Sequence, residues 1–318
     1  MLNLESRVYI AGHEGLLGSA FLRRLKLDGY KNILLKTHSE LDLYSSCETH
    51  RFFEAEQPEY VILAAGMVGG IVENKTLPYE FIKNNLAIQM SIFGAAERSK
   101  VKKLLFFGSS CMYPKICKQP MSEEALFSGV PESTSIAYAV SKMAGMQMCI
   151  SYNEQHKENK FLPLIPNSIY GPNDNFSLES SHVLSALIRR FCDAKAANLD
   201  SVTLWGSGEV RREFIYVDDV VDASLMLMTH DLSHVNFPIN VGNGHEVTIK
   251  DLACMISEIV EFSGVIKWDT SKPDGAPRKL LDSSKLNNLG WKPLTTLEVG
   301  LKKTYEWYIN SSKDNLKL

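Results

Sequence analysis

The sequence lacks the features of membrane-spanning, secreted or nucleic-acid-binding proteins. No apolar run reaches the roughly 18 residues that a membrane-spanning helix needs. The opening residues, MLNLESRVYIAG, hold too short an apolar stretch for a signal peptide. A formal net charge of −3 over 318 residues gives no reason to expect nucleic acid or an anionic membrane as a partner. We therefore expect a cytoplasmic protein with neither kind of partner.

Cysteine is scarce, and its spacing is not that of a metal site. The six cysteines stand at positions 47, 111, 117, 149, 192 and 254, and no two form a Cys-x-x-Cys pair. Cys111 and Cys117 have no histidines beside them in the sequence. We expect reduced thiols and no metal.

The first half of the chain alternates short apolar runs with amphipathic stretches. The runs predict strands at 7–11, 32–36, 60–64, 103–107 and 161–165, and the stretches predict helices at 16–27, 45–56, 79–99 and 138–156. This alternation is typical of βαβ units with right-handed crossovers. The predicted fold class is α/β, a Rossmann-like doubly wound parallel sheet with a smaller α/β substrate-binding domain.

The pattern changes after about residue 166. Strands are predicted at 202–205 and 213–217, and helices near 181–195, 218–229, 248–262 and 296–310. The run INVGN at 239–243 resembles one more strand of the first sheet. We therefore expect a dinucleotide-binding domain over 1–165 with a recrossing near 213–245, and a substrate domain over 166–212 and 246–318. The polar tail after Asn310 is expected to fray.

A glycine motif lies between the first predicted strand and helix. Gly12, Gly15 and Gly18 have the spacing G-x-x-G-x-x-G, and Leu16 and Leu17 open the helix. Such glycines permit a tight turn and let a pyrophosphate approach the backbone at a helix N-terminus. The motif predicts a dinucleotide site.

The end of the second predicted strand indicates which dinucleotide binds. It reads Leu-Lys-Thr-His-Ser with no acid before Glu40, so Lys36 and His38 are candidates for a 2′-phosphate. Glu14 in the glycine loop would repel that phosphate. The balance favours NADP(H), with NAD(H) left open. Asp42 and Ala64 are further expected cofactor contacts.

A second motif indicates hydride-transfer chemistry. Tyr138 and Lys142 are four residues apart, so they share one face of a predicted helix. We expect the ammonium to lower the pKa of the phenol, which then exchanges a proton with a carbonyl oxygen. Ser109 follows a predicted strand at the sheet edge where doubly wound folds bind ligands, and it is expected to bond the same oxygen.

These motifs make the chain similar to the GDP-L-fucose synthase family of extended short-chain dehydrogenases/reductases. The matching stretches are YIAGHEGLLGSA, VGGIVEN, KLLFFGSSCMYPK, the Tyr138 helix, YGPNDNF, SHVLSALIRRF, WGSGEVRREFIYVDD and SKPDGAPRKLLD. Together they extend over essentially the full length.

The resemblance implies a two-stage reaction on a GDP-linked 4-keto sugar. Cys111 and His182 fall on the family's acid/base pair, which inverts C-3 and C-5 through enolates. Tyr138 then protonates the C-4 oxygen as NADPH supplies hydride. The family's contacts to the nucleotide-sugar fall on Asn175, Trp205, Arg212 and Lys279. The resemblance also implies a homodimer paired through the helices at 79–99 and 138–156.

Departures from the family pattern gather at the expected site. They are Glu14, His38, Met67, Ser135 to Ala137, Ser168 and the loop Phe176 to Glu179. They leave three alternatives open. One is a plain C-4 reductase of a related GDP-4-keto-6-deoxy sugar such as a heptose. Another is an NAD-dependent nucleotide-sugar 4-epimerase, and the third is a non-catalytic NADP-sensing regulator.

Overall fold

Six parallel strands form the central sheet of the protein. The computed structural model describes residues 2–315 except 179, 231, 233, 236 and 273. The strand order is β2-β1-β3-β4-β5-β9. The strands are β1 (Val8–Ala11), β2 (Ile33–Lys36), β3 (Tyr60–Leu63), β4 (Lys103–Phe107), β5 (Phe161–Pro166) and β9 (Ile239–Val241). The order reverses direction at β1, so the crevice beyond the carboxyl ends of β1 and β3 is the expected ligand site.

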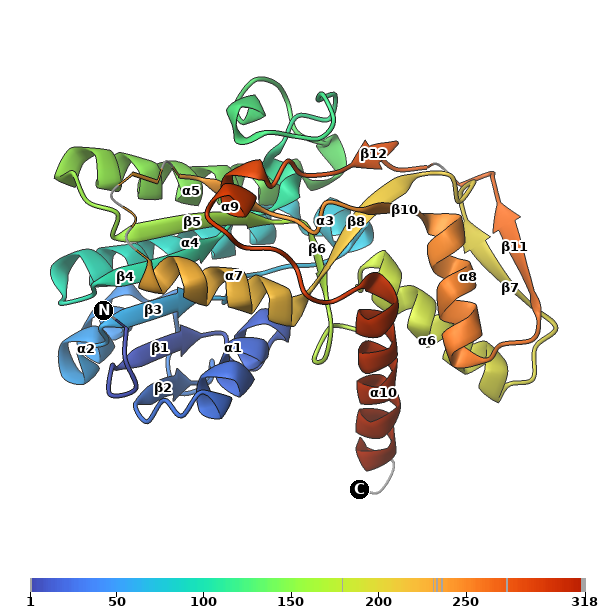
Figure 1. Ribbon diagram of the computed structural model, residues 1–318, viewed down its shortest axis with the longest axis horizontal. Helices are drawn as coiled ribbons and strands as arrows, with labels where there is room; N and C mark the ends of the chain where they lie inside the picture. The colour runs from blue at the N-terminus through green and yellow to red at the C-terminus, as the bar shows by residue number, and fades with distance from the viewer. Residues whose placement is uncertain are drawn as a thin grey trace.

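Helices cover both faces of this sheet, as Figure 1 shows. α1 (Leu16–Leu27) and α7 (Val217–Thr229) pack together on one face, over a core that includes Ile10, Phe21 and Leu164. The other face carries α2 (Ser46–Glu56), α4 (Pro78–Arg98) and α5 (Ile136–His156). Strands buried on both faces read as continuous apolar runs, and every residue of β1 and β3 is buried. The predicted doubly wound α/β fold is confirmed.

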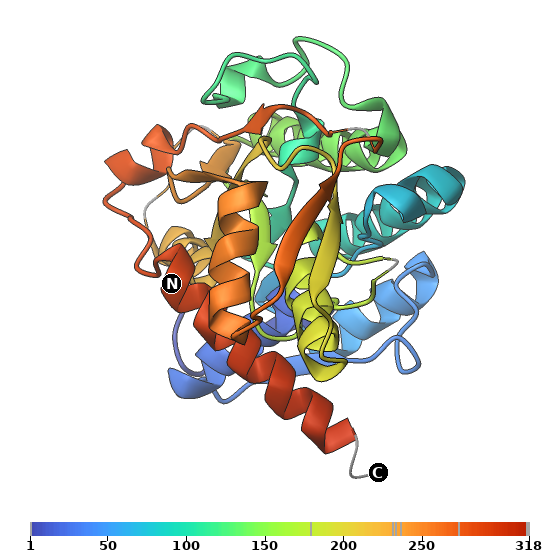
Figure 2. The same cartoon turned by 90° about the vertical axis from the view of Figure 1, so that its right-hand side faces the viewer.

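The rest of the chain builds a smaller α/β region beside the sheet (Figures 1 and 2). β8 (Arg211–Tyr216) pairs with β6 (Ser168–Tyr170), β10 (Glu246–Thr248) and β12 (Arg278–Lys279). β7 (Ser201–Trp205) pairs with β11 (Val265–Asp269). α6 (Val183–Ala196), α8 (Ile249–Val260) and α10 (Leu297–Asn315) share a third apolar core with these strands. Two short helices, α3 (Ile71–Thr76) and α9 (Ser284–Asn288), complete the α-helices of the described residues.

Two expectations about the second half need correction in detail. Of the recrossing expected near 213–245, α7 and β9 lie with the six-stranded sheet, whereas β8 lies in the second sheet. The tail expected to fray after Asn310 continues as helix α10 to Asn315. Glu179, within the divergent loop, and Pro273, within SKPDGAPRKLLD, lie outside the described residues.

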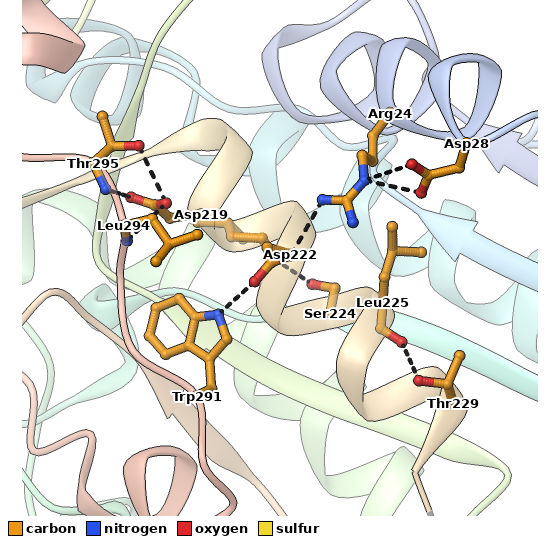
Figure 3. Close-up of polar contacts among 11 residues, drawn as sticks. Arg24, Asp28, Asp219, Asp222, Ser224, Leu225, Thr229, Trp291, Leu294 and Thr295 are labelled. Carbon is orange, nitrogen blue, oxygen red and sulfur yellow. Dashed lines mark hydrogen bonds and ion pairs between the residues drawn. The ribbon is translucent and has the colours of Figure 1, made fainter.

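Polar contacts join the segment before α10 to the helices of the first sheet (Figure 3). The carboxylate of Asp219 accepts hydrogen bonds from the backbone N–H groups of Leu294 and Thr295 at 3.2 and 3.1 Å. The indole N–H of Trp291 donates to Asp222 at 3.2 Å, and Arg24 donates to the same carboxylate at 3.1 Å. These bonds fix the C-terminal region against α7. No helix among the described residues is long and apolar enough to cross a membrane.

Candidate active site

The glycine motif forms a tight turn between β1 and α1. Gly12 has φ +82°, and a Cβ there would lie 2.7 Å from the backbone of Ala65. A Cβ on Gly18 would lie 2.1 Å from the carbonyl oxygen of Gly12, so α1 approaches the turn too closely for a side chain. Gly15 is the N-cap of α1 and has no side-chain cap, and Leu16 and Leu17 begin the helix. The first N–H groups of α1 are therefore open to a phosphate.

The residues expected to distinguish NADP from NAD lie after β2. Lys36 ends the strand, and exposed His38 stacks edge-on against Tyr44. Glu40 accepts two bonds from Thr37, both at 2.8 Å, and these lower the pKa of its carboxyl.

The other expected cofactor contacts lie around the same crevice. Asp42 accepts a bond from the backbone of Tyr44 at 2.9 Å, and Ala64 follows β3 and donates to Ala11 at 3.0 Å. Glu14 is exposed at the glycine turn. The predicted cofactor residues thus belong to the ends of β1, β2 and β3.

Ser109 and Tyr138 meet at the carboxyl end of β4. Ser109 caps the short 3₁₀ helix η1 (Ser110–Met112), and its hydroxyl accepts a hydrogen bond from the backbone of Cys111 at 3.2 Å. The Tyr138 hydroxyl, carried on the first turn of α5, is hydrogen-bonded to the Ser109 side chain. Tyr138 is only 9% exposed, and the ring of Phe81 packs edge-on against it. The predicted Ser–Tyr pair is therefore assembled.

Lys142 joins this pair from one turn further along α5. Its buried ammonium donates to the carbonyl oxygen of Phe107 at 2.9 Å and lies 5.8 Å from the centre of the Tyr138 ring. Burial lowers the pKa of Lys142 to about 8.

The expected effect of Lys142 on the phenol is not what the structure shows. Burial raises the pKa of Tyr138, with a further contribution from the charge of Cys111. Burial outweighs the hydrogen bond with Ser109, which lowers the pKa of the phenol. Lys142 is itself desolvated, and its ammonium is bonded to the carbonyl group of Phe107. The phenol therefore keeps its proton at neutral pH, as a proton donor requires.

Cys111 lies within the same cluster. The ammonium of Lys279, on β12, is 3.9 Å from its sulfur, and the side chains of Ser109 and Ser135 bond to it. Burial opposes ionisation of the thiol, but these neighbours, Lys279 foremost, lower its pKa below the ordinary value.

Arg212 approaches this cluster from β8, directly opposite Lys279 in the strand register. Burial lowers the pKa of its guanidinium, and the charges of Cys111 and Asp274 partly offset this effect. Its Nη1 donates to the carbonyl oxygen of Arg211 at 2.7 Å. Two cations therefore face Cys111 from paired strands.

His182 and Asn175 lie in the segment between β6 and α6. His182 is exposed at the N-cap of α6, where its charge acts on the carboxyl of Asp174. The amide of Asn175 donates to Ser180 at 2.8 Å and accepts from the backbone of Ser177 at 2.9 Å. These two bonds hold the loop together. The described contacts of Cys111 do not include His182.

The remaining candidate, Trp205, ends β7 and is 62% exposed, with the ammonium of Lys272 5.7 Å from its ring.

Two surface hollows lie elsewhere. One of about 440 Å³ lies beside β9, and one of about 540 Å³ lies between α1 and α7. Neither is lined by the glycine turn, Tyr138 or Cys111.

Comparison with known proteins agrees with this geometry. The family model described as "NAD dependent epimerase/dehydratase family" matches residues 8–242. The chain belongs to this family.

Its relatives include two GDP-L-fucose synthases. GDP-L-fucose synthase 1 of Arabidopsis thaliana is 48% identical, over 98% of this chain and 95% of the relative. GDP-L-fucose synthase of Escherichia coli strain K12 is 45% identical, over 96% and 98%. A solved structure of a GDP-mannoheptose C4 reductase from Campylobacter jejuni with NADP bound superposes with a TM-score of 0.88. It is 38% identical and covers 97% of this chain and 100% of that one. The resemblance drawn from the motifs is confirmed.

The sequence assigned no role to two residues that lie beside Cys111 and His182. Ser135 bonds to the sulfur of Cys111, and Asp174 lies beside His182 with its pKa raised by burial. A hydroxyl three residues before Tyr138, one helical turn away, was a signal for Ser135. Asp174 stands within YGPNDNF, but nothing in the sequence places its carboxylate near His182.

The divergent segment around Met67 forms one wall of the site. A Cβ on Gly66 would lie 3.7 Å from the ammonium of Lys142, and Gly70 donates its N–H to Ser180 at 3.0 Å. The segment therefore extends from Lys142 to the loop that carries His182. Asn85 fixes it by bonding both the N–H and the carbonyl group of Met67, at 3.1 and 2.9 Å.

Proposed function

We propose that this protein reduces the C-4 ketone of a GDP-4-keto-6-deoxy sugar with NADPH, with or without prior epimerisation at C-3 and C-5. The observation that carries the proposal is the bonding of Ser109 to both Tyr138 and Cys111, with the buried ammonium of Lys142 5.8 Å from the centre of the Tyr138 ring. GDP-L-fucose synthases 45–48% identical to this chain support the substrate class. Residues 1–165 with α7 and β9 would serve the cofactor, and the second region the GDP-sugar.

The residues present fit a dinucleotide. The turn at Gly12 and Gly18 leaves no room for a Cβ, and the buried Nδ1 of His13 has no partner among the described residues. Gly12, Gly15, Leu16, Leu17 and Gly18 would hold the pyrophosphate, with Asp42 and Ala64 beside the adenosine. Lys36 and His38 would bind the 2′-phosphate. NADPH, when bound, supplies the hydride that C-4 accepts.

Tyr138 moves the proton that reduction requires. Its phenol remains protonated because burial holds its pKa well above the ordinary value. It gives that proton to the oxygen at C-4, which the hydroxyl of Ser109 orients. Lys142, bonded to the carbonyl group of Phe107, fixes the position of the phenol and stabilises the tyrosinate that forms.

Cys111 and His182 would perform the epimerisations. The thiolate of Cys111 takes a proton from the carbon beside the ketone, so an S–H bond forms, a C–H bond breaks and the electron pair moves to the ketone oxygen. His182 returns a proton to the opposite face of the enolate. Arg212 and Lys279 bind the diphosphate, and Asn175 and Trp205 bind the remainder of the nucleotide-sugar.

Analysis of the product by NMR tests the proposal. The purified protein is mixed with GDP-4-keto-6-deoxy-D-mannose and NADPH in deuterated water. GDP-L-fucose that carries deuterium at C-3 and C-5 is the result expected of a full epimerase-reductase. No consumption of NADPH with this substrate or its heptose counterpart would contradict the proposal.

A plain C-4 reductase is the second candidate. Its support is the similarity to a GDP-mannoheptose C4 reductase, which is 38% identical to this chain. A reduced sugar without deuterium at C-3 or C-5 would identify this activity.

The exposed apolar side chains of α4 and α5 support a homodimer in the cytoplasm. Tyr79 and Met90 on α4 are 66% and 58% exposed, and Ile136 and Val140 on α5 are each 41% exposed. The two helices pack side by side, so a second copy would cover both. Light scattering at micromolar concentration should give twice the 35.7 kDa of one chain. A mass of one chain would refute the dimer.

A further inference from the structure

Lys279 lies on a surface strand, but its ammonium contacts the sulfur of Cys111. β12 lies along β8 with Lys279 beside Arg212, and the Nζ of Lys279 is 3.9 Å from the Sγ of Cys111. Within the described residues no carboxylate pairs with Lys279. The nearby acids are engaged elsewhere, since Glu246 pairs with Arg278 and Asp274 bonds Ser207.

The other groups around Cys111 come from the end of β4, the turn before α5, α5 itself and β8. The hydroxyls of Ser109 and Ser135 bond to the sulfur, from the end of β4 and from the turn before α5. Arg212 on β8 contributes a second positive charge, and Tyr138 on α5 contributes a neutral phenol. Lys279 is the closest cation, and its charge is the largest influence that favours the thiolate.

The same lysine is assigned above to the diphosphate of the substrate. An ammonium that faces both a thiolate and a diphosphate stabilises each anion less when both are present. Each anion lowers the positive potential that the other experiences. A thiolate that loses part of this stabilisation becomes a stronger base. The position of Lys279 therefore connects binding of the nucleotide with the reactivity of the sulfur.

We propose that Lys279 holds Cys111 as a thiolate before substrate arrives, and that the bound diphosphate then draws on the same ammonium and strengthens the sulfur as a base. The second half rests on the proposed function, and the first half does not. Lys279 acts through Cys111 and is in this respect a positioning residue.

Alkylation of the ligand-free protein tests the first half. The full chain is treated with iodoacetamide from pH 5 to 10, and modification of the Cys111 peptide is followed by mass spectrometry. The midpoint of the pH profile reports ionisation of the thiol, and the plateau at high pH reports its accessibility. Lys279→Met should move the midpoint to higher pH and slow alkylation at pH 7 by about tenfold, with an unchanged plateau.

Two variants serve as controls. Lys279→Arg keeps the charge and should keep the midpoint near that of the wild type. Arg278→Met removes the neighbouring cation, which pairs with Glu246, and should change nothing. A midpoint that stays in place in Lys279→Met would overturn the proposal. Lys279→Gln replaces Lys279→Met if the methionine variant does not fold.

Addition of GDP as a diphosphate probe tests the second half. GDP should raise the pH midpoint of Cys111 alkylation in the wild type. It should not change this midpoint in Lys279→Met. A lower plateau with no change in midpoint would show shielding alone and would contradict this half. Because alkylation requires no turnover, failure of NADPH oxidation would overturn the proposed function and leave the result for Lys279 standing.

Discussion

The centre and the rim of the site differ in how they are built. Ser109, Tyr138 and Lys142 stand on a buried strand end and a long helix, and each is bonded to another part of the cluster or to β4. His182 and Trp205 stand at exposed ends of elements in the smaller region. The centre is held by the packing of the main sheet, whereas the rim depends on loops such as 171–181.

This difference separates chemistry from substrate choice. Burial of the central groups shifts their pKa values and fixes their geometry, which hydride transfer to any 4-keto sugar would need. Two departures from the family pattern, at Met67 and at Phe176 to Leu178, fall in the wall and the rim, whereas a third, Ser135, lies beside Cys111. We infer that the fold preserves the hydride-transfer reaction while the loops contribute to the choice of sugar.

Tyr138→Phe should have the largest effect, because it removes the proposed proton donor and keeps the ring. Reduction should fall by about 10³-fold or more, while NADPH binds as before. NADPH oxidation at 340 nm measures the first quantity, and NADPH fluorescence titration the second. Tyr152→Phe, on the same helix but away from the cluster, is the matched control. Turnover within tenfold of the wild type would remove Tyr138 from the mechanism.

Lys142 should make the free energy of unfolding depend on pH. Its pKa is about 8 in the folded protein against 10.5 for the ordinary side chain, so between these values the unfolded chain binds more protons. The contribution of Lys142 to the free energy of unfolding should therefore rise by about 3 kcal/mol from pH 8 to 10.5, and it should be lowest below pH 8. In Lys142→Met this contribution should be absent.

Urea denaturation at pH 7.5, 9 and 10.5 measures this difference between wild type and variant. The exposed lysine variant Lys75→Met should retain the wild-type pH dependence. Parallel curves for the wild type and Lys142→Met would show that burial does not perturb Lys142.

Trp205→Ala should give the smallest effect, because this rim residue is 62% exposed. We expect the KM for the GDP-sugar to rise by about fivefold, as for loss of one exposed aromatic contact, with kcat unchanged. Steady-state kinetics with varied substrate separates the two constants. A fall in kcat with constant KM would place Trp205 in the chemical step and erase the distinction between centre and rim.

The sequence predicted the centre better than the rim, for physical reasons. β1 to β5 and α1 have strong apolar periodicity, and the glycine, Ser109 and Tyr138 motifs lie at their ends, so topology alone brings them together. β12 has two residues and no periodicity, so the approach of Lys279 to Cys111 was not predictable. The direction of the Tyr138 pKa was predicted wrongly, because a sequence shows the neighbouring lysine but not the degree of burial.

Transfer of label from the cofactor to the sugar distinguishes reduction from epimerisation. NADPH that carries deuterium at the transferable position on C-4 of its nicotinamide ring is incubated with the protein and GDP-4-keto-6-deoxy-D-mannose, and the product sugar is examined by NMR. Reduction should place one deuterium at C-4 of the sugar and consume one NADPH for each product formed. A converted sugar without this label, or conversion with no net oxidation of NADPH, would contradict reduction and indicate a 4-epimerase that regenerates its own cofactor.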